Sequence, residues 1–109
     1  YPVLFPNTFF GIHSDHLFVM YLKPLSNTET SEHVRIFYVG DQSLADQYQT
    51  LRQTTLTNWD KVFKEDIFAV ERMQKGRLSP AFTGGVFSPE MDGPTLHFHR
   101  WVATAMNQK

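Results

Sequence analysis

The chain has 109 residues, of which 41% are hydrophobic and 15% aromatic, and it contains no cysteine. This composition predicts one globular domain and excludes wholesale disorder, a disulfide scaffold, a cysteine nucleophile and a cysteine-ligated zinc or iron–sulfur site within the chain. Ten basic and eleven acidic residues give a net charge of −1, which leaves no basic surface for nucleic acid. No apolar run approaches the roughly 20 residues of a membrane span. The missing cysteines also fit a cytoplasmic location, which we expect.

Three segments in the first 40 residues are typical of β-strands. Residues 3–10 are rich in β-branched and aromatic side chains, although Pro6 interrupts them. Residues 17–23 form a second apolar run, and residues 33–39 alternate in polarity as a strand with one covered face does. Turn residues at 11–16 separate the first two runs. The spacing therefore predicts an antiparallel meander.

The pattern becomes helical after residue 41. Residues 42–53 and 58–75 have the spacing of helices, and the threonine-rich stretch 54–57 between them is a weak helix former. We expect either two helices, the second starting at a capping box at Thr57, or one bent helix. Gly76 is expected to cap the C-terminal end.

Glycine and proline dominate residues 79–94, which are predicted to be a loop with a short extended piece at 82–87. Pro94 suits the first turn of a last helix, expected over residues 95–107. The element order β-β-β-α-loop-α predicts an α+β fold, with an antiparallel sheet packed on a long helix.

Asp66 breaks the pattern of the predicted helix. At about 100° per residue it falls in the middle of an apolar face, which comprises Leu56, Trp59, Val62, Phe63, Ile67, Val70 and Met73. A charge that faces a core is costly unless it is paired, protonated or bound to metal. Asp66 is therefore either a structural carboxylate that bonds an amide or an arginine, or a ligand or acid–base group.

The five histidines do not form a metal-binding pattern. His13 and His16 lie in a predicted turn and are expected at the surface, and His33 is expected to start a strand. His97 and His99 point about 200° apart on a helix and so cannot share a ligand there.

Several short motifs, taken in order, resemble a known family. These are Phe5-Pro6-Asn7, then Glu65-Asp66-Ile67 with Glu71-Arg72-Met73-Gln74-Lys75-Gly76, and finally Phe98-His99-Arg100-Trp101. Together they resemble the C-terminal part of the catalytic domain in the alpha subunit of Rieske non-haem iron oxygenases, the aromatic-ring-hydroxylating family. The resemblance covers nearly the whole chain.

The resemblance implies a START-like helix-grip fold, present in part, and an oxidoreductase function. Members hold one Fe(II) with two histidines and one carboxylate, and the carboxylate matches Asp66. Such an enzyme inserts oxygen from O₂ into an aromatic or other apolar substrate. Electrons reach the iron from a reductase or ferredoxin through a [2Fe-2S] Rieske cluster, and members are commonly trimers. The implied substrate pocket is lined by Phe5, Phe9, Val62, Phe63 and Val70, for which packing in a core is the simpler alternative.

The chain also departs from the family pattern. The two-histidine motif and the cysteine-bearing Rieske domain do not occur in it. The chain begins at Tyr1 within a strand-like run, so we expect residues 1–109 to be the C-terminal portion of a catalytic domain, inactive alone and without the Rieske domain.

The sequence is also compatible with two other functions. A small non-enzymatic helix-grip protein could bind an apolar ligand between sheet and helix, which the aromatic content fits equally well. An interaction domain could use the outward-facing Phe68 and the loop at 79–94 as its contact surface.

Overall fold

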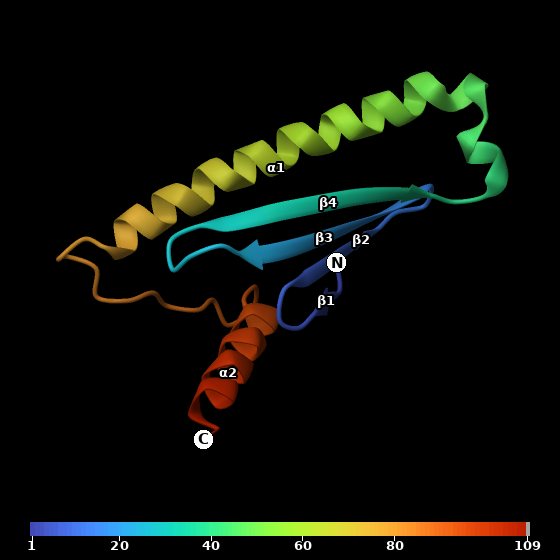
Figure 1. Ribbon diagram of the computed structural model, residues 1–109. Helices are drawn as coiled ribbons and strands as arrows, with labels where there is room; N and C mark the ends of the chain where they lie inside the picture. Colours follow the sequence, from blue (N-terminus) through green and yellow to red (C-terminus); the bar gives the residue numbers. More distant parts are fainter. Residues whose placement is uncertain (109) are drawn as a thin grey trace. The chain divides into compact units, whose positions relative to one another are not determined.

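The computed structural model describes residues 1–108 and contains a four-stranded antiparallel sheet, two α-helices and two 3₁₀ turns (Figure 1). The strands lie in the order of the sequence, namely β1 (Val3–Leu4), β2 (Thr8–Ile12), β3 (His16–Pro24) and β4 (Thr30–Tyr38). The predicted α+β class and antiparallel meander are confirmed. The chain divides into two units, 1–66 and 67–109, which we describe separately.

The first predicted strand is in fact two short strands. Phe5 to Asn7 form a turn with a cis peptide bond before Pro6, and β1 folds back on β2. The amide Nδ2 of Asn7 donates a 2.8 Å hydrogen bond to the carbonyl oxygen of Leu22 on β3. The prediction of one strand over 3–10 was therefore wrong, because Pro6 ends the strand rather than bending it.

The strand register assigns each side chain to one of two sheet faces. His16 pairs with Tyr38, and Phe18 pairs with both Gly11 and Ile36. Paired residues of antiparallel strands point to the same side, so these side chains share one face, which we call the inner face. Residues of the other parity form the outer face, which includes Phe10, Ile12, Leu17, Val19, Tyr21, Arg35 and Phe37.

Helix α1 (Gln49–Arg77) is one continuous helix of 29 residues. The helix runs without a break through the threonine stretch, where the hydroxyls of Thr54 and Thr57 donate to the carbonyls of Thr50 and Gln53 one turn earlier. The two-helix alternative and the capping box at Thr57 were therefore wrong. Gly76 lies inside the helix, which ends one residue later, so its predicted role as a cap was also wrong.

The segment between β4 and α1 consists of two 3₁₀ turns, η1 (Asp41–Leu44) and η2 (Asp46–Tyr48), where a helix had been predicted. The side chain of Arg52, in the first turn of α1, bonds to this segment. One guanidinium nitrogen of Arg52 donates to the carbonyl oxygens of Ser43 (2.7 Å) and Ala45 (3.0 Å). These bonds join both 3₁₀ turns to the first turn of α1, and the Ala45 carbonyl also accepts the backbone N–H of Tyr48 at 3.0 Å.

In the second unit, α2 (Gly93–Asn107) follows a loop without strands. Pro94 lies in its first turn, as predicted, and Asp92 precedes it as the N-cap residue. The Asp92 carboxylate accepts a 2.7 Å hydrogen bond from the backbone N–H of Ser88. Phe68 on α1 is exposed, and the Arg72 guanidinium lies 3.9 Å from the centre of its ring. None of the helices in residues 1–108 is long and apolar enough to cross a membrane.

Candidate functional site

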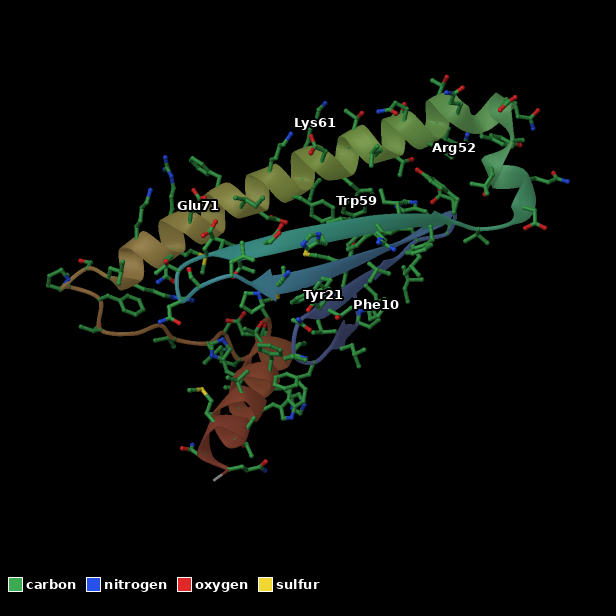
Figure 2. All side chains as sticks on the ribbon, in the orientation of Figure 1. Phe10, Tyr21, Arg52, Trp59, Lys61 and Glu71 are labelled. Atoms are coloured by element: carbon green, nitrogen blue, oxygen red, sulfur yellow. The ribbon has the colours of Figure 1, made fainter. Side chains whose placement is uncertain are left out.

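Aromatic side chains join the inner face of the sheet to α1 within the first unit. Phe18 is the best-buried hydrophobic residue described, at 5% exposed. Its ring meets Trp59 at 4.5 Å and Phe63 at 5.4 Å between centres, both edge to face. Trp59 points from α1 toward the strands (Figure 2), and Phe63 contacts the same ring of Phe18. Gly11 makes room for this cluster, because a Cβ there would lie 2.0 Å from the Phe18 ring.

A hydrogen-bonded chain of three side chains runs beside these rings. The indole N–H of Trp59 donates to Nε2 of His16 at 2.8 Å, and Nδ1 of His16 lies 2.8 Å from the Asp15 carboxylate. An indole can only donate and a carboxylate can only accept. The two partners therefore require the His16 tautomer with its proton on Nδ1. The bond from Nδ1 is the main cause that lowers the pKa of Asp15.

The histidines of the turn are less exposed than predicted. His16 is 8% exposed and is the first residue of β3. His13 stacks on it, with ring centres 4.6 Å apart, and Nε2 of His13 is buried without a hydrogen-bond partner among the described residues. The prediction that both are surface residues was wrong for His16, because the strand begins at this residue and turns its ring toward Trp59.

Asp66 lies on α1 one turn after Phe63, on the side of the helix that faces the sheet. Its charge acts on Glu32 of β4, whose pKa is raised first by burial and second by Asp66. Register places Glu32 on the inner face, in line with Val34 and Ile36. The two carboxylates therefore lie on facing surfaces of helix and strand.

Asp66 is exposed in this structure. The half-buried positions of α1, Arg52, Thr55, Trp59 and Phe63, end before it. The expectation of a carboxylate facing a core was wrong for residues 1–108, because the aromatic packing stops one turn earlier. The Asp66 carboxylate has no hydrogen bond or ion pair within this part of the chain. Its predicted role as a metal ligand is a separate matter and stays a prediction.

The predicted pocket residues are only partly brought together. Phe63 is half-buried against Phe18, and Phe9 lies on the same inner face opposite Met20. Phe5 is half-buried in the turn before β2, whereas Val62 is 42% exposed on α1. Val70, in the second unit, is 61% exposed.

A cavity of about 370 Å³ opens at the other end of the sheet, by the start of α1. Its walls include Asp15, Tyr38, Tyr48 and Arg52. The Tyr38 hydroxyl donates a 3.1 Å hydrogen bond to the carbonyl oxygen of Arg52. This hydrogen bond links β4 to α1 at the wall of the cavity.

No group of three or more histidine, aspartate or glutamate side chains lies close enough to hold a metal within the described residues. Both ring nitrogens of His16 are already engaged. Asp66 offers an uncommitted carboxylate, which suits one arm of a two-histidine, one-carboxylate iron site. The chain thus fits such a site as the donor of one ligand.

Comparison with protein families gives a match over residues 1–108 to the ring hydroxylating alpha subunit (catalytic domain). The chain belongs to this family. The ring-hydroxylating oxygenases are oxidoreductases, and the antiparallel sheet with helices agrees with their catalytic-domain fold. The predicted resemblance is therefore confirmed. No solved structure matches the chain significantly.

Sequence reasoning missed two residues of this ring-hydroxylating domain that the structure places near the helix. Glu32 continues the alternation of Val34, Ile36 and Tyr38 by one step, so a longer predicted strand could have identified it. His16 precedes Phe18 by two residues, which is the spacing of side chains on one strand face.

Proposed function

We propose that this chain supplies the carboxylate ligand, Asp66, to the mononuclear iron of a Rieske-type aromatic-ring-hydroxylating oxygenase. The observation that carries the proposal is the family match over residues 1–108. Asp66 fits the role in two ways: it lies on the sheet-facing side of α1, and its carboxylate is not engaged by other described side chains.

The two histidine ligands would come from residues outside these 109, in the same catalytic domain. When bound, Fe(II) would supply the activation of O₂ for insertion into the substrate. Electrons would come from a reductase or ferredoxin through a [2Fe-2S] Rieske cluster. The 109 residues alone would be inactive, since one carboxylate cannot hold iron firmly.

The substrate would be an aromatic or other apolar small molecule. Phe9 and Phe63 support this, because they lie on facing surfaces of sheet and helix, and Phe63 is one turn before Asp66 on α1. Phe5 and Val62 complete the proposed lining within the first unit, and the role of Val70, in the second unit, stays a prediction. We further propose a helix-grip arrangement for the complete catalytic domain, a homo-oligomer such as a trimer, and a cytoplasmic location.

Asp66→Asn in the complete alpha subunit that contains this chain tests the proposal. We expect mononuclear iron, measured by metal analysis, to fall about tenfold or more and product formation to stop, since asparagine keeps the shape but loses the charged ligand. The absorbance of the Rieske cluster is expected to stay unchanged.

Asp60→Asn is the matched control. Asp60 lies on the same helix and pairs with Lys64 at the surface, at 2.7 Å, so its loss should leave iron unchanged. Full iron content in Asp66→Asn would contradict the proposal. A complete protein that carries no iron yet binds an apolar ligand would support the non-enzymatic binding protein instead.

A further inference from the structure

The hydrogen bond between Trp59 and His16 is the directional contact between α1 and the middle of the sheet. Rings that pack edge to face tolerate small rotations, whereas an N–H···N bond of 2.8 Å loses strength as its angle opens. The Asp15 carboxylate holds the His16 ring in the acceptor tautomer that this bond requires. Both ends of the imidazole are therefore fixed.

Three positions of α1 that face the sheet are spaced seven residues apart. Arg52 accepts the Tyr38 hydroxyl at its carbonyl oxygen, Trp59 donates to His16, and Asp66 follows. Seven residues make nearly two turns, a rise of about 10 Å, so the three positions lie along one line of the helix. His16 and Tyr38 are also paired neighbours in the sheet. The first two positions thus bond α1 to the sheet, whereas Asp66 makes no hydrogen bond within the described residues.

A rotation of the helix at Trp59 would be transmitted to Asp66 by the rigid backbone. A carboxylate about 6 Å from the helix axis moves by about 1 Å when the helix turns by about 10°. A displacement of that size is enough to cost about 100-fold in an active site.

We propose that Asp15, His16 and Trp59 are positioning residues, which fix the rotation of α1 on the sheet and with it the direction of the Asp66 carboxylate. The inference rests on the proposed role of Asp66, and it extends that role to three side chains that do not touch the iron. The outer member, Asp15, is exposed, and the inner members are buried or half-buried.

Because the chain contains no cysteine, spin labels can be attached selectively to introduced cysteines. Spin labels on Lys64→Cys in α1 and Arg35→Cys on the outer face of β4, both exposed in the first unit, report the distance from helix to sheet by pulsed electron resonance. His16→Phe keeps a buried ring but removes the acceptor, whereas His16→Gln keeps an acceptor for the indole. We expect the distance distribution to broaden about twofold in His16→Phe and to stay narrow in His16→Gln.

The indole proton of Trp59 gives a second readout, with Trp101→Phe to leave a single indole signal. In His16→Phe this proton should exchange about tenfold faster with solvent, because its hydrogen bond is lost. Trp59→Phe removes the donor instead, and should broaden the distance distribution as His16→Phe does. It serves as the deciding variant if His16→Phe does not fold.

Phe63→Leu is the packing control, since it thins the aromatic cluster without touching the hydrogen bond. A distribution as broad in Phe63→Leu as in His16→Phe would overturn the inference and assign the orientation to packing alone. An unchanged distribution in both His16→Phe and Trp59→Phe would overturn it as well. Neither outcome bears on iron retention in Asp66→Asn, so the two proposals fail separately.

Discussion

Glu32 and Asp66 place two carboxylates on facing surfaces of β4 and α1. Burial raises the pKa of Glu32, and the charge of Asp66 raises it further. Like charges in this arrangement disfavour ionisation. A cation that bound Asp66 would relieve this repulsion, so the pair costs stability in the metal-free chain.

Glu32→Gln is expected to stabilise the first unit at neutral pH. A carboxyl whose pKa is higher in the folded than in the unfolded state destabilises the folded state when ionised. That cost is absent below the unfolded pKa, near pH 4, and is complete once the pH exceeds the folded pKa. Urea denaturation at several pH values should show that the unfolding free energy of the variant exceeds that of the wild type by a growing amount as the pH rises from about 4.

Two further substitutions test whether the effect is specific to Glu32 and how much of its raised pKa comes from Asp66. Glu29→Gln removes an exposed carboxylate in the turn before β4 and should leave stability unchanged. Asp66→Asn should lower the pKa of Glu32, which NMR titration can measure. A pKa of Glu32 that stays the same in Asp66→Asn would contradict the facing arrangement.

The position of Asp66 on the sheet-facing side of the helix follows from helical periodicity alone. Its exposure does not, because periodicity shows which residues share a face but not where the covering layer ends. The bond between His16 and Trp59 joins residues 43 apart in the sequence, and no local pattern encodes such a contact.

At the scale of elements, α1 continues through both features that were expected to end it. The threonine hydroxyls bond to backbone carbonyls one turn earlier, and Gly76 lies within the last two residues of the helix. Packing against the sheet in the first half of the helix outweighs weak local propensity, a common result for long helices.

Gly76→Ala distinguishes the helical position from a capping position. A Cβ at Gly76 would meet no atom within 4 Å, and the residue lacks a positive φ. Alanine there should therefore stabilise the chain by about 0.5–1 kcal/mol, as in other helical sites. Thermal unfolding followed by the helical circular dichroism signal measures this gain.

Gly84→Ala provides the comparison in the loop. Gly84 has a φ of +110°, which alanine adopts only with strain, so this variant should lose stability. If Gly76→Ala also lost stability, the helix would end before residue 76, as a C-cap glycine requires.

Elements with strong local signals were predictable from sequence, as the strands over 16–24 and 30–38 and the helix over 93–107 show. The β1–β2 turn and the two 3₁₀ turns were not. Both depend on how short segments pack against neighbours, the first through Asn7 and the second through Arg52, and each of these side chains bonds to a distant backbone carbonyl.

At the scale of the whole chain, the buried core is small and lies in the first unit. Gly11, His16 and Phe18 are the only buried residues in the described part of the chain. Apolar side chains remain exposed on the outer face of the sheet, for example Ile12 and Phe37. Stability of the first unit therefore depends heavily on a few aromatic contacts.

Phe18→Ala is expected to cost about 3–5 kcal/mol, which is a large share of the stability of a domain this size. Phe37→Ala, a change of the same residue type on the outer face, should cost about 1 kcal/mol or less because Phe37 is already 51% exposed. Urea denaturation of the two variants measures the difference. Equal losses would show that the outer face is also covered.

Asp15 shows that the exposure of a surface residue does not by itself predict how well it tolerates substitution. Exposure ordinarily marks a site that tolerates change, and Asp15 would pass that criterion. Its carboxylate nevertheless selects the His16 tautomer that Trp59 needs. In a library of single variants, position 15 should accept fewer residue types than other exposed aspartates such as Asp46, so tolerance here follows the hydrogen bond and not the accessible area.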